Sequence, residues 1–160
     1  MKTSVVSIAM REQNGADPAP DPTPGYILEH QVGHLLRRAH QRHTSIFQEG
    51  IGTSQLTPTQ FAALMKIKDL GQVSQNQLGR LTAMDPATIQ GVIQRLLARG
   101  LVERYPDATD RRCTLLRLSP AGRQVAASVI APARAVSEQT LSPLGEAERA
   151  TFLDLLRKLI

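Results

Sequence analysis

The sequence predicts a mainly helical fold that carries one small β-hairpin. Hydrophobic residues make up 41% of the 160 positions but aromatic residues only 3%, so the core should be aliphatic. Most apolar residues recur at helical spacing, behind residues that favour helix starts. Only residues 101–105 and 114–118 read as two short strands around a polar turn. A chain of this length is most simply one domain.

The chain begins with residues 1–25, which we expect to form a flexible leader. Proline occupies every second position from Pro18 to Pro24, which prevents helix formation and favours an extended backbone. A long helix is predicted over residues 26–49, because apolar residues recur there at helical spacing. This helix also carries all four histidines of the chain.

A second helix is expected to start at Thr57, whose side chain can cap it, with Pro58 in the first turn. Ser74 and Gln77 form an S-x-x-Q capping box that opens a third, short helix. Leu78 and Leu81 are expected to face inward from that helix. A tight turn then leads to the fourth helix, which gives the helix-turn-helix pattern.

The fourth helix has two different faces. Asp85 is a favourable N-cap, Pro86 opens the helix and Gly100 ends it. The apolar face consists of Ile89, Ile93, Leu96 and Leu97. The polar face consists of Thr88, Gln90, Gln94 and Arg95, side chains that can contact base edges in the major groove of DNA. Ala87 is a weaker candidate, for contact with a thymine methyl group.

The hairpin follows the fourth helix directly, and its polar turn over residues 106–112 contains two arginines. A hairpin in this place is typical of a wing, which can put an arginine into a narrow minor groove. A further long helix is predicted from Ser119 to about Leu141, with a bend at Pro132. The last helix spans about residues 146–159. The long, apolar end helices are interpreted as a dimerisation region.

The charge distribution favours a nucleic-acid partner. The net charge is +5, and eight arginines but only four acidic residues lie between Arg80 and Arg123. Arginine suits bidentate contact with phosphate and guanine. The few aromatic residues disfavour single-stranded nucleic acid, whose binding depends on stacked rings. Double-stranded DNA is therefore the expected partner.

Other classes of protein find little support. No glycine-rich phosphate loop or nucleophile with a nearby base is evident, so an enzyme is not expected, and no cofactor is predicted. No apolar run is long enough for a membrane span, and the N-terminus lacks the pattern of a secretory signal. The single cysteine, Cys113, excludes an internal disulfide and fits a cytoplasmic protein.

The sequence resembles the MarR family of winged-helix regulators. The resemblance is carried by LTPTQFAAL at residues 56–64, SQNQLGRLTAMDPATIQGVIQRLLARGLVER at 74–104, PDATDRR at 106–112 and LSPAGR at 118–123. It covers residues 26–160 and implies two helices, a strand, two helices, two strands and two helices. The winged helix-turn-helix would span about residues 56–118, and the dimerisation helices about 26–50 and 119–160.

The resemblance also implies a function and a set of DNA contacts. Members of the family are homodimers that bind pseudopalindromic operators, commonly repress a catabolic or efflux gene cluster, and are commonly released by a small aromatic acid. In the wing, one arginine would enter the minor groove and the aspartate would fix the hairpin. The expected DNA-binding residues are Ser74, Gln75, Gln77, Thr88, Gln90, Gln94, Arg95, Asp110, Arg111 and Arg112.

An effector pocket is expected where the dimerisation helices meet the winged domain. An arginine or histidine beside an apolar cavity suits an aromatic carboxylate, such as a benzoate-like or pyridine-carboxylate-like acid. The candidate ligand-binding residues are Arg38, His40, His43, Phe61 and Met65. Each histidine alone is more simply read as an ordinary surface or core residue.

Three alternatives stay open at this point. His30 and His34 are spaced for a shared metal, but the chain offers few further ligands, and no metal site is predicted. Cys113 could respond to oxidation, although a structural role is the simpler reading. An architectural DNA-binding protein would bind with little sequence preference and without a ligand response.

Overall fold

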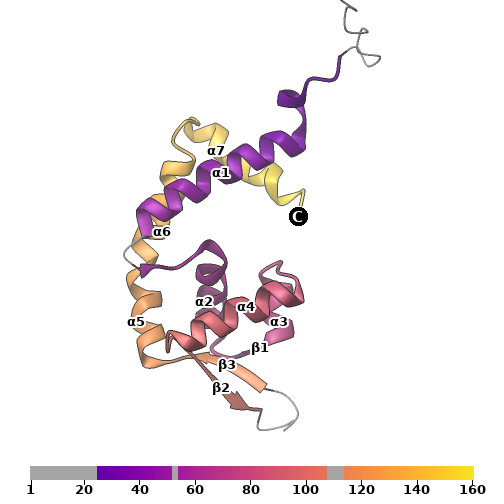
Figure 1. Ribbon diagram of the computed structural model, residues 1–160. Helices are drawn as coiled ribbons and strands as arrows, with labels where there is room; N and C mark the ends of the chain where they lie inside the picture. The colour runs from indigo at the N-terminus through magenta and orange to yellow at the C-terminus, as the bar shows by residue number, and fades with distance from the viewer. Residues whose placement is uncertain (1–24, 52–53, 108–113) are drawn as a thin grey trace, which may run out of the picture.

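Residues 25–51, 54–107 and 114–160 are described by the structure, a computed structural model of the chain. The helices are η1 Leu28–His30, α1 Val32–Ile51, α2 Pro58–Leu70, α3 Gln75–Leu81, α4 Pro86–Ala98, α5 Pro120–Ser128, α6 Ile130–Thr140 and α7 Glu146–Arg157. The strands are β1 Val73–Ser74, β2 Val102–Pro106 and β3 Thr114–Leu118. Helices α2, α3 and α4 gather around the sheet, while α1, α6 and α7 form a separate layer of helices, and α5 connects the two groups (Figure 1).

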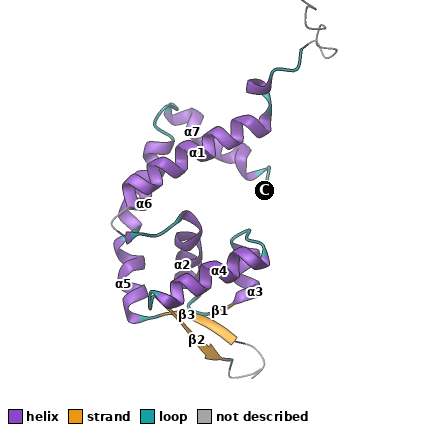
Figure 2. Ribbon diagram, viewed as in Figure 1, coloured by secondary structure: helices purple, strands orange, loops and turns teal. Residues whose placement is uncertain are grey.

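The sheet is small and antiparallel, with β3 between β1 and β2 (Figure 2). In the hairpin, Val102 pairs with Leu118 and Pro106 pairs with Thr114. Strand β1 adds to the other edge of β3, where Val73 pairs with Leu116. The predicted hairpin is therefore confirmed, with the first strand beginning one residue later than expected. The mainly helical winged fold class is confirmed as well.

Side-chain caps fix the helix starts of the winged unit where the sequence predicted them. Thr57 accepts a hydrogen bond from the Gln60 backbone, and the Gln60 side chain accepts one from the Thr57 backbone. The Asp85 and Ser119 side chains cap α4 and α5, each followed by a proline in the first turn. These caps replace intrahelical partners that the first N–H groups of a helix lack.

The core of the winged unit is closed around α4. Leu64, Leu78, Val92, Ile93 and Leu96 have no measurable exposure. Helix α5 joins this core at Gly122, where an added Cβ would lie 1.9 Å from the Leu101 carbonyl oxygen. Only glycine allows that close approach, so the first turn of α5 is held against the start of the hairpin.

The predicted helix from Ser119 to Leu141 consists of two helices. Helix α5 ends at Ser128 and α6 begins at Ile130. Pro132, two residues after Ile130, lacks the N–H that a continuous helix would need there. Because proline cannot donate to the carbonyl of Ser128 four residues earlier, the helical ladder is interrupted there. The bend expected at Pro132 therefore appears as a break centred on Val129.

Two other expectations from the sequence need correction. The first helix does not run continuously from residue 26: a short 3-10 turn, η1, precedes α1, which then continues to Ile51. Leu81 is 47% exposed and not buried as expected. Helix α3 packs on its neighbours through Leu78 and Gly79, and Leu81 lies about 100° from the middle of that face.

Helix α1 packs along α6. The His43 imidazole Nδ1 lies 3.0 Å from the Thr140 hydroxyl, and the Arg42 guanidinium donates to the Gln139 carbonyl at 3.2 Å. On the remaining surface of α1, η1 and α7, many large apolar side chains are exposed. They are Tyr26, Ile27, Leu28, Val32, Leu35, Leu36, Phe152, Leu155, Leu159 and Ile160, and we call them the terminal apolar surface. Helix α7 has no buried residue.

Candidate nucleic-acid interface

Helix α4 separates its apolar and polar residues as the sequence predicted. Ile89, Val92, Ile93 and Leu96 are buried against the winged core. The side chains of Gln90, Gln94 and Arg95 are exposed on the outer face. The outer face carries amide and guanidinium groups, while the opposite face packs on the winged core and fixes the position of the helix. Such a helix can present donors and acceptors to base edges.

The start of α4 is held by Asp85. One carboxylate oxygen accepts hydrogen bonds from the backbone N–H of Ala87 at 3.0 Å and of Thr88 at 2.9 Å. The other accepts from the Thr88 hydroxyl at 2.5 Å. These bonds, that from the Thr88 side chain foremost, lower the pKa of Asp85. Because its proton is already donated to Asp85, the Thr88 side chain can offer other groups only an acceptor oxygen or its methyl group.

Arg95 lies over Gly91, one turn earlier on the same helix. An added Cβ at Gly91 would be 3.5 Å from the nearest guanidinium nitrogen of Arg95. Glycine is unfavourable inside a helix by about 1 kcal/mol relative to alanine. A Cβ at that distance would make an ordinary van der Waals contact, so the Arg95 guanidinium does not require glycine at position 91.

Three arginines of the basic stretch are used to hold the fold together. Arg99 donates to the carbonyl oxygens of Ser54 at 2.7 Å and Gln55 at 2.9 Å, which ties the end of α4 to the segment before α2. Arg123 donates to the Leu118 carbonyl at 2.9 Å. Arg117 forms an ion pair with Glu103 at 3.2 Å and lies 4.9 Å above the ring of Tyr105.

Three other arginines, Arg80, Arg95 and Arg104, are exposed and make no side-chain hydrogen bond or ion pair within residues 25–51, 54–107 and 114–160. Only Arg95 was predicted as a DNA contact. Arg104 shares a strand face with buried Val102 but is itself exposed, a difference that residue spacing does not reveal. No sequence signal singles out Arg80 on its short helix either.

The hairpin is attached to the rest of the winged unit through Tyr105. Its hydroxyl donates to the side-chain oxygen of Gln72, in the segment between α2 and β1. The three predicted wing contacts, Asp110, Arg111 and Arg112, lie outside the described residues, as does Cys113. The paired strands β2 and β3 lead directly into that turn.

The predicted contacts at the start of α3 differ in their surroundings. The Ser74 hydroxyl accepts from the Gln77 backbone at 3.3 Å and thus forms the first half of the expected capping box. The Gln77 side chain is exposed, and Gln75 is partly exposed at the edge of a hollow that the hairpin also lines.

Of the five effector candidates, three lie in one region. His43 is half-buried, with its ring centroid 6.3 Å from that of Phe47, and Phe47 packs edge-on against Phe61 at 5.5 Å. Phe61 and Met65 are partly buried neighbours of the core. This group lies where α1 meets α2, at the boundary between the helical layer and the winged unit.

The other two candidates do not join that group. His40 and Arg38 are both exposed on α1. Five residues separate Arg38 from His43, which rotates it about 140° around the helix axis. Within one copy of the chain, Arg38 therefore cannot complete a site around His43 without a change in the helix.

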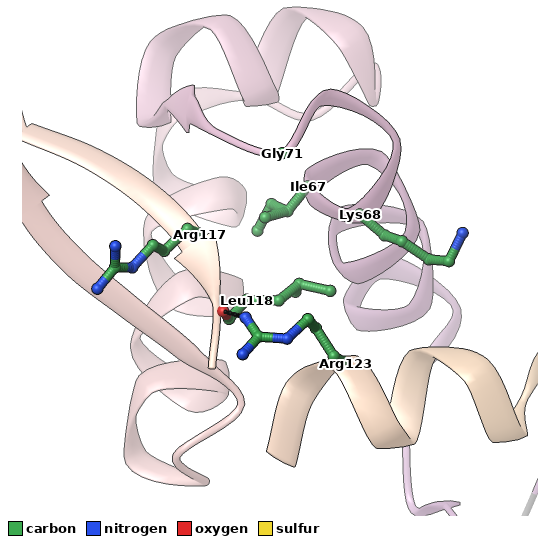
Figure 3. A pocket seen from close by; sticks show the side chains of 6 residues that line it. All are labelled: Ile67, Lys68, Gly71, Arg117, Leu118 and Arg123. Carbon is green, nitrogen blue, oxygen red and sulfur yellow. Dashed lines mark hydrogen bonds between the residues drawn. The ribbon is translucent and has the colours of Figure 1, made fainter. Parts of the chain in front are cut away.

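A cavity of 220 Å³ lies between α2, β3 and α5. It is lined by Ile67, Lys68, Gly71, Arg117, Leu118 and Arg123. Figure 3 shows that the charged ends of Lys68 and Arg117 point away from each other and out of the cavity, while Arg123 turns to the Leu118 carbonyl. Despite its three cationic residues, this cavity does not gather charge around a common point.

Comparison with known proteins agrees with this geometry. A model of the MarR family matches residues 56–114. The transcriptional repressor NicR of Pseudomonas putida is 46% identical over 140 residues, which cover 88% of this chain and 88% of NicR. The chain belongs to the MarR family.

Two solved structures extend the comparison over both groups of helices. A probable transcriptional regulator from Pseudomonas aeruginosa is 49% identical, with a TM-score of 0.81 over 84% of this chain and 100% of that chain. BpsR of Bordetella bronchiseptica, whose DNA binding is regulated by 6-hydroxynicotinic acid, is 43% identical. Its TM-score is 0.80 over 84% of this chain and 96% of that chain.

Membership in the MarR family makes the chain a transcriptional regulator and confirms that it is not an enzyme. Among the described helices, none is both long and apolar enough to cross a bilayer. His30 lies in η1 and His34 in the first turn of α1, where the His34 Nδ1 is 3.5 Å from the Arg37 guanidinium. No group of three metal-ligating side chains occurs in the described parts of the chain.

Proposed function

We propose that this MarR-family regulator is a homodimeric repressor that binds a pseudopalindromic operator and is released by a small aromatic acid. The observation that carries the proposal is helix α4, which buries its apolar face and exposes Gln90, Gln94 and Arg95 on its outer face beside the hairpin. In the proposed arrangement, residues 56–118 contact DNA. Residues 26–50 and 119–160 pair two copies.

The proposed base contacts come from α4. The Arg95 guanidinium, which has no hydrogen bond or ion pair among the described residues, suits the two acceptors of guanine. Gln90 and Gln94 suit adenine. Thr88 contributes an acceptor or its methyl group. The proposed backbone and minor-groove contacts are Ser74 at the N-cap of α3, Gln75 and Gln77 in α3, and Asp110, Arg111 and Arg112 in the wing.

The proposed dimer rests on the terminal apolar surface. Val32 is 67% exposed, Leu155 55% and Leu159 69%. Large apolar patches on a single soluble chain mark interaction sites. A second copy of the same surface would cover them and would place two winged domains on one face of the assembly.

An aromatic acid is proposed as effector for two reasons. NicR is a repressor and BpsR responds to 6-hydroxynicotinic acid, at 46% and 43% identity. The rings of His43, Phe47 and Phe61 offer an aromatic surface that suits the ring of such an acid. Thr140 donates its hydroxyl proton to the Val136 carbonyl at 2.7 Å, so it accepts from His43 Nδ1. In the neutral imidazole, Nε2 then remains an acceptor for a ring hydroxyl, and an imidazolium would pair with a carboxylate.

The DNA part of the proposal is tested with wing variants. Arg111→Ala and Arg112→Ala should each weaken binding to a selected operator duplex by at least about tenfold, because a charge-assisted contact is lost. Binding is measured by electrophoretic mobility shift, and sedimentation checks that the dimer is intact. Arg117→Ala, in the same hairpin but paired with Glu103, serves as the matched control. Unchanged binding in both wing variants would contradict the wing assignment.

The effector part is tested with a panel of benzoic, hydroxybenzoic, nicotinic and 6-hydroxynicotinic acids. At least one acid should raise the melting temperature and release the operator, because a ligand stabilises the state that it binds. His43→Ala should reduce both effects, while His30→Ala, an exposed histidine outside the aromatic group, should not. Failure of the whole panel would exclude an aromatic-acid effector and favour an architectural or differently regulated DNA-binding protein.

A further inference from the structure

The two faces of the hairpin have different roles. Because side chains alternate along a strand, Val102, Arg104 and Pro106 share one face of β2. On that face the register places Val102 opposite Leu118 and Arg104 opposite Leu116, and both leucines are buried. Arg104 therefore projects from the face that is turned toward the helices, just beyond the point where the apolar core ends.

Arg117 occupies the opposite face, where it is held by Glu103 and by the ring of Tyr105. Arg104 is exposed and has no such partner within the described residues. Within the described strands of the hairpin, Arg117 is thus neutralised by Glu103, whereas Arg104 has no acidic partner there. The Arg104 charge lies on the face toward α3.

Arg104 lines a hollow of 250 Å³ between the hairpin and α3. The other lining residues are Gln75, Thr114 and Leu116. Leu116 is buried and forms an apolar part of the wall, whereas Gln75 and Thr114 offer an amide and a hydroxyl. A cation together with two neutral donors matches an oxyanion that carries a single negative charge.

The position of this hollow indicates which oxyanion it receives. If α4 lies in the major groove and the tip of the hairpin in the adjacent minor groove, the sugar-phosphate backbone that separates the two grooves must cross the hairpin between them. The hollow opens on the hairpin face that borders this path. Phosphate contacts at such points set the register of a protein on the duplex.

We propose that the hollow seats one backbone phosphate of the operator, with Arg104 as its cation and Gln75 and Thr114 as neutral donors. The proposal rests on the proposed DNA-binding function. It adds a phosphate contact that positions the protein on the duplex, between helix α4 in the major groove and the wing in the minor groove. Arg104 makes no base contact in this arrangement, so it contributes to affinity and not to sequence preference.

The test compares Arg104→Ala, Arg104→Lys and Arg117→Ala on a selected operator duplex and on a random-sequence duplex of equal length, over a series of salt concentrations. Arg104→Ala should weaken both complexes by a similar factor, about tenfold, and lower the salt slope by about one. Arg104→Lys should recover most of the slope. Arg117→Ala removes the same charge from the other face and should leave the slope near that of the wild type.

Two results would overturn the proposal in distinguishable ways. If the wild type binds the operator but Arg104→Ala shows the same slope as Arg117→Ala, the phosphate seat is wrong while the proposed function stands. If the wild type shows no salt-dependent binding to either duplex, the proposed function and the phosphate seat fail together. Melting temperatures show whether each variant folds. If Arg104→Ala does not fold, Arg104→Lys, which retains an aliphatic stem, still allows the comparison with Arg117→Ala.

Discussion

The winged unit and the end helices bury their apolar residues to very different degrees. Around α4, the side chains of Leu64, Val92 and Ile93 are fully enclosed within one copy of the chain. In α7 no residue is buried, and Phe152 and Leu155 are 41% and 55% exposed. The winged unit thus encloses its core within one copy of the chain, whereas the end helices keep an apolar surface that no other described residue covers.

The two regions are joined by the hydrophobic core, where Phe47 of α1 packs on Phe61 of α2, and by polar contacts. Arg99 joins the end of α4 to the Ser54 and Gln55 carbonyls, close to where α1 ends. On the other side, α5 and α6 are separated by the break at Val129. A movement of one pair of end helices relative to another would therefore reach the recognition helix through short connections. This arrangement suits a regulator in which an effector changes the spacing of two winged units.

The largest expected effect of a single substitution lies in the closed core. Ile93→Ala should lower the free energy of unfolding by about 2–5 kcal/mol, because it removes a fully buried side chain and leaves a cavity. The loss, measured by urea denaturation, should not depend on protein concentration. Leu155→Ala is the matched truncation in α7, and its effect should grow as the protein is diluted. Equal behaviour of the two variants would remove the distinction between the regions.

A smaller effect on folding, but a decisive one on assembly, is expected for charges on α7. The double variant Phe152→Glu and Leu155→Glu should sediment as a monomer with helical content close to that of the wild type, since these side chains support no core within one copy. Operator affinity should fall because two half-sites are no longer bound together. A variant that remains a dimer would show that the terminal apolar surface is not the interface.

The smallest effect is expected at the cap of the recognition helix. Asp85→Ala should lower the melting temperature by about 2 °C near neutral pH. Since its hydrogen bonds with Thr88 lower the pKa of Asp85, its stabilising contribution is present above the unfolded-state pKa of about 4 and is lost as the pH falls through the lower folded-state value. The melting temperatures of the wild type and of Asp85→Ala, measured from pH 7 to 2.5, should therefore converge at the acidic end. A difference that stays constant over this range would contradict the capping role.

Local signals predicted the winged unit well. Caps followed by proline, at Asp85 and Ser119, fix helix starts through contacts within three residues, so the sequence contains the whole interaction. The sequence predicted burial and side-chain orientation less well where these depend on packing between residues far apart in the sequence. Leu81 has an apolar side chain but lies off the face that α3 buries, and Arg104 and Arg117 look alike until the register places them on opposite faces.

The effector candidates show the same limit. The ring contact of Phe47 with Phe61 joins two helices, and nothing in the sequence places these residues together. The charge of Arg38 suggests a carboxylate partner, but its rotation around α1 directs it away from His43. To predict a site that several helices form together, one must know how each helix is rotated relative to the others. Residue spacing predicts only which residues share a face of the same helix.

The central claim, that two copies of this chain read two halves of one operator, is tested most directly by selection of bound duplexes from a random-sequence library. The account predicts enrichment of a pseudopalindrome whose half-site centres are separated by about 10 base pairs, because paired winged units face the same side of the duplex. Insertion of about half a helical turn between the half-sites should abolish tight binding. Enrichment of a single half-site, or of no common sequence, would contradict the account.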